Sequence, residues 1–114
     1  ALDGYDEISL TGEVKIKTRH SDANYSPMDL GLNKVQPEDI YGGDTKDEAA
    51  AIFMRVIKGA GTQAQQEAVY ANAGVAISTI DSGLTLTEGV LKAKESVISG
   101  HAFQSLNKLI QLAV

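Results

Sequence analysis

The sequence predicts an α+β fold in which a β-hairpin over residues 8–27 is followed by about four α-helices over residues 44–114. Side chains in residues 14–19 alternate between apolar or hydroxyl and basic types, which is the period of a half-buried strand. Beyond residue 44, three Thr-x-x-Glu or Thr-x-x-Gln capping boxes each precede a run of apolar residues with helical spacing. The length of 114 residues and the hydrophobic content of 43% suit one small domain with a packed core.

Within the hairpin, residues 8–11 alternate between apolar and hydroxyl side chains and predict the start of the β structure. The polar cluster at residues 21–24 predicts the turn, and residues 25–26 the returning strand, which Pro27 ends. The basic side chains of residues 15–19 lie on one face of the strand, which we expect to be solvated because the strand lies at an edge of the sheet.

Two short segments after the hairpin, residues 27–32 and 37–40, each begin with Pro followed by acidic residues, an order that favours single helical turns. The pair Gly42-Gly43 precedes the first long helix and could in principle hold a phosphate at the helix N-terminus. The carboxylate of Asp44 would repel an anion there, so we interpret the pair as a turn that leads into the N-cap.

The capping boxes at residues 45–48, 62–65 and 85–88 predict where three helices begin, and a fourth helix is expected over residues 101–114. Short connections around Gly59, Gly83 and Gly100 predict that neighbouring helices are roughly antiparallel. Gly74 lies inside the second helix, where Gly costs about 1 kcal/mol relative to Ala, and this favours close packing. The expected inward faces are Ala49, Ile52, Phe53, Val56 and Ile57; Val69, Ala73, Ala76 and Ile80; Leu86, Val90, Ala93 and Val97; and Phe103, Leu106, Leu109, Ile110 and Ala113.

The composition argues against several classes of function. Fifteen acidic residues against 10 Lys and Arg give a formal net charge of −5, whereas binding to a nucleic-acid backbone requires clustered positive charge. The sequence has no Cys, which excludes disulfides and thiolate zinc sites and is in keeping with a cytoplasmic protein. It has neither an apolar run of the roughly 20 residues that span a membrane nor a signal peptide.

The candidate for chemistry is the pair Asp6-Glu7, which follows Gly4 near the N-terminus. Adjacent carboxylates are commonly solvated surface residues, but in a loop they can also supply the oxygen ligands that Mg²⁺ takes alongside phosphates. His20 and His101 have no nearby partners with metal-site or triad spacing, so we expect both at the surface. The sequence contains no Walker A loop, dinucleotide-binding glycine pattern or regular array of aromatic residues.

Several segments, taken in collinear order, resemble the anthranilate phosphoribosyltransferase family. Residues 4–12 match its G-x-D-E-(I/V)-S-x-x-G segment, and residues 27–32 match its P-x-D-(F/L)-G-L element. Gly42-Gly43-Asp44, followed by Asn72-Ala73 in the long helix, matches its G-G-D … N-A pattern. The last part of the chain, residues 88–106, matches its E-G … A … S-G-x-A … L tail.

The resemblance implies an enzyme of tryptophan biosynthesis that transfers phosphoribosyl from phosphoribosyl pyrophosphate to anthranilate and releases pyrophosphate with the help of Mg²⁺. It implies that Asp6 and Glu7 are the metal ligands. It also implies that this chain is the C-terminal part of a larger α/β domain of the phosphoribosyltransferase and nucleoside-phosphorylase kind, in a homodimeric protein. The family's helical domain, its G-T-G-G-D and K-H-G-N segments and its anthranilate-contacting residues would then lie upstream. Glu48 departs from the family pattern, since many members have Asn there.

A chain that lacks the phosphate-binding segments is expected to be inactive alone, and its uncovered apolar faces favour self-association. Three other interpretations stay open from the sequence: a nucleic-acid-binding relative of the same fold, a nucleoside phosphorylase relative, and a structural module without retained function. The negative net charge disfavours the first of these, and the Asp-Glu-Ile-Ser segment disfavours the second.

Overall fold

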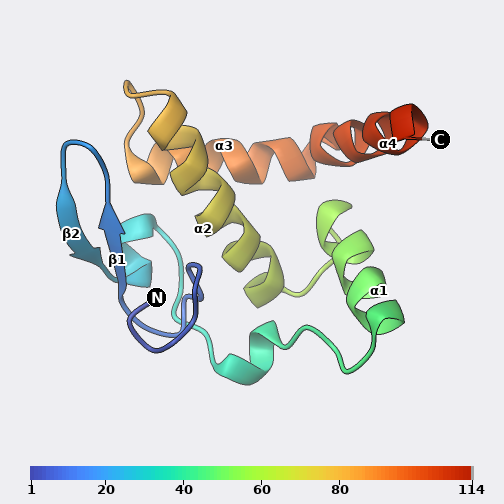
Figure 1. Ribbon diagram of the computed structural model, residues 1–114, viewed down its shortest axis with the longest axis horizontal. Coiled ribbons are helices and arrows are strands. Elements are labelled where there is room, and N and C mark those ends of the chain that lie inside the picture. The colour runs from blue at the N-terminus through green and yellow to red at the C-terminus, as the bar shows by residue number, and fades with distance from the viewer. Residues whose placement is uncertain (114) are drawn as a thin grey trace.

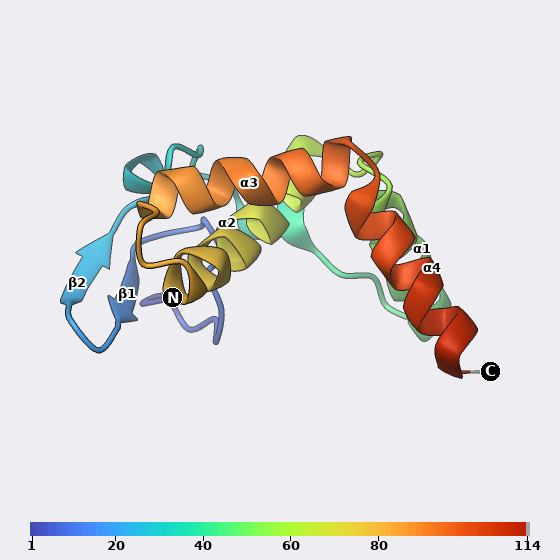
Figure 2. The same cartoon turned by 90° about the horizontal axis from the view of Figure 1, so that it is seen from above.

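The computed structural model describes residues 1–113 and has the predicted α+β architecture (Figure 1). Two antiparallel strands, β1 (Val14–Lys17) and β2 (Asp22–Tyr25), precede two 3₁₀ turns, η1 (Pro27–Leu30) and η2 (Pro37–Ile40). Four helices follow: α1 (Lys46–Ile57), α2 (Gln63–Ile80), α3 (Leu86–Ile98) and α4 (His101–Ala113). The hairpin and N-terminal loop lie at one end of the crossed pair α2 and α3, and α1 and α4 lie at the other (Figures 1 and 2).

The hairpin is shorter than predicted, and its turn is placed differently. Residues 8–11 form no strand, because Leu10 has a left-handed backbone (φ 64°) that interrupts an extended chain. The turn covers residues 18–21 instead of 21–24. The hydroxyl of Thr18 accepts hydrogen bonds from the amides of His20 (3.2 Å) and Ser21 (3.0 Å), which closes the turn three residues early. Asp22 can therefore pair with Lys17 in the ladder.

The burial pattern of β1 is as predicted: Val14 and Ile16 are buried and Lys15 and Lys17 are exposed. Both lysines approach the carboxylate of Asp22, at 3.2 Å and 3.7 Å. Exposed pairs of this kind contribute less than about 1 kcal/mol each. Asp22 nevertheless neutralises part of the positive charge of Lys15 and Lys17 within the hairpin itself.

The three predicted capping boxes begin α1, α2 and α3. In each, the threonine hydroxyl accepts from the backbone amide three residues later, and the Glu or Gln side chain accepts from the amide of the threonine. Ser26 and Asp29 make the same reciprocal arrangement at η1. Both Pro-initiated segments are single 3₁₀ turns, as predicted. These local rules thus determine where the elements begin, independently of the tertiary packing.

The capping box of α3 predicts a pH-dependent stability. Hydrogen bonds from the backbone amide and then the side chain of Thr85 hold the pKa of Glu88 below its ordinary 4.5. A carboxyl whose pKa is lower in the folded state stabilises the fold above its unfolded pKa, and this contribution is lost as the pH falls through the folded value. In melting curves from about pH 6 to about pH 3, the advantage of the wild type over Glu88→Gln should shrink steadily. Glu95→Gln, on the same helix, is the control, and an advantage that is constant with pH would contradict the assignment.

Helices α2 and α3 cross in close contact at two glycines. A Cβ on Gly89 would lie 2.2 Å from the carbonyl oxygen of Gly74, and a Cβ on Gly74 would lie 2.5 Å from the backbone of Val90. Neither distance is sterically possible, so only Gly allows the helices to approach this closely. The packing interpretation of Gly74 is therefore confirmed. The buried members of the core beside this crossing are Tyr70, Val90, Ala93 and Val97.

The predicted inward face of α3 is largely correct, whereas that of α2 is mostly wrong, since only Ala73 of its four residues packs against the core. Val69 and Ile80 are exposed, at 42% and 88%. The face of α2 that is buried consists of Gln66, Tyr70, Ala71 and Gly74. The amide of Gln66 can be buried because it is satisfied: it accepts from the amide of Gly61 (3.1 Å) and donates to the hydroxyl of Tyr70 (2.8 Å).

Helix α4 does not fold back on α3 as an antiparallel neighbour. It turns away after Gly100, whose φ is 84°, and extends from the end of α3 toward the side of α1 (Figure 2). Phe103 and Leu106 are half-buried, with Lys58 placed 4.8 Å from the centre of the Phe103 ring, but Leu109 and Ile110 are exposed. In α1 only Val56 is buried. The predicted inner face of α4 is thus mostly exposed, whereas that of α1 is exposed at Ala49 and Phe53 and half-buried or buried elsewhere. Val114 lies outside the described residues.

Candidate functional site

The N-terminal loop, residues 3–12, carries the predicted carboxylate pair and is built into the core at its C-terminal end. The side chain of Leu10 is 1% exposed and packs with Leu30, Val35 and Ala71. The carbonyl of Leu10 accepts a hydrogen bond from the amide of Val35 (3.0 Å). Burial of a Leu side chain contributes roughly 1.5–3 kcal/mol, so this end of the loop is held by both packing and backbone pairing.

A second anchor lies two residues earlier, where the side-chain amide of Asn72 on α2 meets the backbone of Ile8. The Oδ1 atom of Asn72 accepts from the amide of Ile8 (3.0 Å), and its Nδ2 atom donates to the carbonyl of Ile8 (2.8 Å). The same Nδ2 donates to the carbonyl of Ala68 (2.8 Å), one turn earlier on α2. Both polar groups of one loop residue are therefore paired with a helix far away in the sequence.

Short polar contacts close the loop on itself. The hydroxyls of Ser9 and Thr11 are 2.7 Å apart, and Thr11 also donates to the carboxylate of Asp3. The amide of Leu2 donates to the carbonyl of Glu13 (2.9 Å), which brings the two ends of the loop together. Ser9 is buried, with its hydroxyl satisfied by Thr11.

Asp6 and Glu7 lie at the outer side of this anchored loop, and both are exposed as expected. The donor set fits Mg²⁺, which prefers carboxylate oxygens, is commonly held by one or two carboxylates and keeps its other positions for water and phosphate oxygens. Groups of three or more His, Asp or Glu side chains able to hold a metal ion do not occur among residues 1–113. The pair therefore suits an ion shared with a phosphate ligand better than an ion enclosed by protein.

A mostly apolar hollow of about 520 Å³ lies between the loop and α2, and Glu7 of the carboxylate pair is in its wall. Its walls include Tyr5 and Glu7 from the loop, Ile40 from η2, and Val69 and Asn72 from α2. The exposed side of α2, which carries Val69, thus faces this hollow rather than the core. Its chemical nature suits a flat apolar group or another part of a protein better than a highly charged one.

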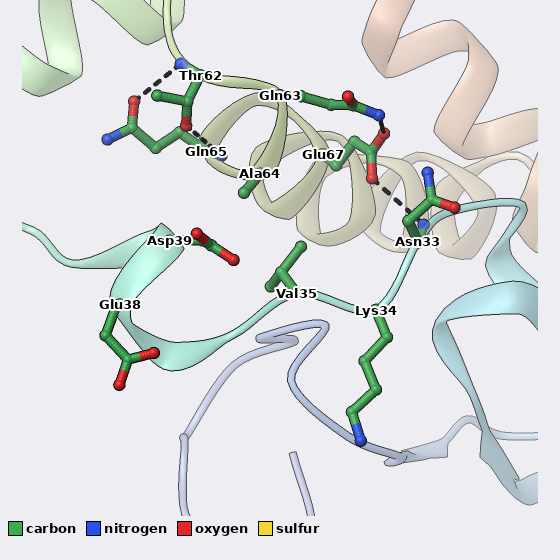
Figure 3. A pocket seen from close by; sticks show the side chains of 10 residues that line it. All are labelled: Asn33, Lys34, Val35, Glu38, Asp39, Thr62, Gln63, Ala64, Gln65 and Glu67. Atoms are coloured by element: carbon green, nitrogen blue, oxygen red, sulfur yellow. Dashed lines mark hydrogen bonds between the residues drawn. The ribbon is translucent and has the colours of Figure 1, made fainter.

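A second, open cleft of about 650 Å³ lies where the segment after η1 passes the N-terminus of α2 (Figure 3). Glu67 on α2 connects its two sides by accepting from the amide of Asn33 (3.3 Å), and it also accepts from the side chain of Gln63 (2.7 Å) on the same helix. Glu38 and Asp39 line the opposite wall, and Lys34 is the one cation among the residues that line it. This predominance of carboxylates disfavours a bound phosphate.

The glycine pair before α1 is a structural turn, as interpreted from the sequence. The carboxylate of Glu48 accepts from the amides of Asp44 (2.7 Å) and Thr45 (3.2 Å), which are the groups that would have bound an anion. Asp44 also accepts a hydrogen bond from the hydroxyl of Tyr41, which raises the pKa of that tyrosine above 10.0. Glu48, which departs from the family pattern, thus has a structural role: its side chain caps the N-terminus of α1.

The two histidines are exposed, as predicted. His20 lies in the hairpin turn, and Nδ1 of His101 is 3.0 Å from the hydroxyl of Ser99 at the start of α4. The role of Asn72 as an anchor of the loop was not predicted; the sequence identifies this residue only as part of a family pattern. Asn is a poor residue for a helix interior, because its side chain competes for backbone hydrogen bonds, and this preference was the available signal.

Comparison with known proteins gives consistent matches. The model of the glycosyl transferase family, a/b domain, matches residues 1–103. The anthranilate phosphoribosyltransferase of Flavobacterium psychrophilum is 45% identical over 114 residues, which are 100% of this chain and 34% of that protein. The enzymes of the same name from Flavobacterium johnsoniae and Phocaeicola vulgatus are 44% and 41% identical, over 100% and 97% of this chain and 34% of each relative.

The chain therefore spans about a third of the length of the curated relatives it matches, 34% in each case. Among residues 1–113, every helix falls short of the length and hydrophobicity that a bilayer-spanning segment requires. The family model covers nearly the whole chain: the anchored loop, the hairpin, helices α1 to α3 and the first turn of α4. Because this model matches residues 1–103, the chain belongs to the glycosyl transferase family, of which it contains part of the a/b domain.

Proposed function

We propose that these 114 residues are part of an anthranilate phosphoribosyltransferase, in which they contribute the carboxylates of the Mg²⁺–diphosphate site. The observation that carries the proposal is the 45% identity along the entire chain to an enzyme of that name. In the reaction, the amine nitrogen of anthranilate forms a bond to C1 of the ribose. The bond from C1 to the diphosphate oxygen breaks, the diphosphate leaves with the electron pair, and the amine loses a proton.

Electrostatics supports a role for Asp6 and Glu7 beside the leaving diphosphate. Two carboxylates would repel a diphosphate that approached them directly, so binding there requires a cation between them. Bound Mg²⁺ would supply neutralisation of the charge that develops on the diphosphate as the bond to C1 breaks. The protein's own contribution is to keep the two carboxylates exposed on a loop that is anchored to the core at Ile8 and Leu10.

The alternative interpretations gain no support from the structure. A nucleic-acid-binding relative would need a free basic surface, whereas Lys15 and Lys17 both approach Asp22. No feature of the described residues favours nucleoside phosphorolysis over phosphoribosyl transfer. A homodimeric whole protein, a cytoplasmic location and the absence of nucleic-acid binding remain predictions from the sequence.

The proposal is tested with the full protein that contains these residues. With Mg²⁺ and phosphoribosyl pyrophosphate present, anthranilate should be consumed and pyrophosphate released in equal amounts, as followed by chromatography and a coupled pyrophosphate assay. Cleavage of nucleosides by inorganic phosphate, with no consumption of anthranilate, would instead establish the phosphorylase alternative.

Residues 1–114 alone are expected to show no transferase activity. Of the two clefts described above, one is mostly apolar and the other is rich in carboxylates, so neither offers groups suited to holding the phosphates of the substrate. We also expect the isolated chain to self-associate, because Leu91, Ile98, Leu109 and Leu112 are exposed at 59%, 66%, 64% and 76%. The measurements are an anthranilate assay and light scattering on purified 1–114. Turnover by the isolated chain would contradict the first expectation, and a monodisperse monomer the second.

A further inference from the structure

Asn72 holds the segment that carries the carboxylate pair through two hydrogen bonds and makes a third within its own helix. Two of them, at 3.0 Å and 2.8 Å, pair with the amide and the carbonyl of Ile8, the residue directly after Glu7. The third, at 2.8 Å, ties the same amide group to Ala68 on α2. Among the described residues, the two bonds to Ile8 are the only hydrogen bonds that join residues 4–8 to a helix.

The arrangement requires an amide side chain in one orientation. Oδ1 faces a donor and Nδ2 faces two acceptors, so a side chain flipped by half a turn would place like groups against each other at all three contacts. A carboxylate in the same position would keep the bond to the amide of Ile8 but would oppose the carbonyls of Ile8 and Ala68. The three partners therefore require the donor and acceptor pattern of Asn, whereas a residue that only filled space on the helix would have no such requirement.

We propose that Asn72 is a positioning residue: it fixes the backbone at Ile8 and thereby the orientation of the Asp6 and Glu7 side chains. This orientation determines how tightly the two carboxylates bind a metal ion together with a phosphate. The inference rests on the proposed function. It follows from the connectivity: the next loop residue that hydrogen bonds to the body of the fold is Leu10, so without Asn72 the carboxylates would be three or four residues away from such an anchor. Within residues 1–113, the carbonyls of Tyr5 and Glu7 accept hydrogen bonds only from the N-terminal amino group, which belongs to the same segment. Residues that orient metal ligands typically change metal affinity or activity about 10–100-fold when substituted.

The test uses the full protein with Asn72→Ala and Asn72→Asp, and with Thr79→Ala as the matched control. Thr79 is exposed on the same helix and hydrogen bonds only to its own helix, at the carbonyl of Val75 (2.9 Å). Binding of Mn²⁺ in the presence of pyrophosphate is measured by the loss of the free-ion signal in electron paramagnetic resonance. Hydrogen exchange at the amide of Ile8 reports directly whether the contact to Asn72 is lost.

Both Asn72 variants should bind Mn²⁺ about 10-fold or more weakly than the wild type and should exchange the Ile8 amide faster. The Mg²⁺ concentration for half-maximal transfer should rise by a similar factor, with kcat largely recovered at saturating Mg²⁺. A purely structural role would reduce the amount of active protein equally at all Mg²⁺ concentrations and leave Mn²⁺ affinity unchanged, which would overturn the inference. If the wild type itself transferred no phosphoribosyl group, the proposed function would fall; an active wild type with unaltered variants refutes only the role of Asn72.

Discussion

Replacing Asp6 by Asn in the full protein is expected to lower kcat/KM for phosphoribosyl pyrophosphate by roughly 10²–10³-fold, because charge stabilisation by a bound metal ion is worth several kcal/mol in the transition state. The amide oxygen of Asn can still reach a cation but carries no charge, so the ion is held more weakly beside the diphosphate. Glu7→Gln should act in the same direction. Steady-state kinetics over a range of Mg²⁺ concentrations measure both effects.

Glu13→Gln is the matched control for this pair. Glu13 is an exposed carboxylate just beyond the loop, and only its backbone carbonyl takes part in closing the loop, through the amide of Leu2. Its substitution changes the net charge as much as Asp6→Asn does but leaves the proposed metal site intact. An Asp6→Asn, Glu7→Gln double variant with the Mg²⁺ dependence of the wild type would refute the assignment of these residues as ligands.

The second large effect is expected at the crossing of α2 and α3, where Gly89→Ala should destabilise the fold by about 3 kcal/mol or more. The added Cβ would lie 2.2 Å from the carbonyl oxygen of Gly74 and 3.2 Å from Cβ of Ser78, so the two helices would have to separate. Ala is the better helix former by about 1 kcal/mol, and a net loss of stability would therefore understate the steric cost.

Urea denaturation of residues 1–114 at one fixed protein concentration, followed by circular dichroism, measures this loss as a difference between variants. Gly42→Ala provides the control, because a Cβ at Gly42 would meet no atom within 4 Å and the residue does not have a left-handed backbone. We expect the control to be close to neutral. Equal midpoints for Gly89→Ala and Gly42→Ala would contradict the close approach of the two helices.

The features that sequence reasoning predicted correctly are those set by local chemistry. The threonines at 45, 62 and 85 cap their helices because a hydroxyl and a carboxylate or amide three residues later can satisfy each other's backbone partners without tertiary contacts. The cost of Gly74 inside a helix likewise indicated close packing before its neighbour was known.

The face of α2 could not be predicted in this way, because apolar residues occur around most of its circumference. Periodicity selected Val69 and Ile80, but close contact at Gly74 turned the helix so that Gln66 and Tyr70 face inward. Burial of Gln66 depends on a partner, Gly61, that lies in a connecting loop. The pairing of a buried side-chain amide with a connecting loop is not visible in a hydrophobic pattern.

The hairpin and the site show the same division between local and tertiary causes. Residues 21–24 resemble a turn, yet the hydroxyl of Thr18 closes the turn earlier and leaves residues 22–24 in β2. The carboxylate pair was identified from the sequence together with a family resemblance, and its exposure is confirmed. The anchors that hold it, Asn72 and Val35, come from segments far along the chain, so only the structure could bring them to the loop.

The most direct test of a metal–diphosphate role for the N-terminal loop is a crystal structure of the full protein grown with Mn²⁺ and pyrophosphate. Anomalous diffraction then locates the ion without ambiguity between metal and water. We predict an anomalous peak about 2.1 Å from a carboxylate oxygen of Asp6 or Glu7, with oxygens of the pyrophosphate on its other side. An ion bound to the pyrophosphate elsewhere, with Asp6 and Glu7 both in contact only with solvent, would contradict the account.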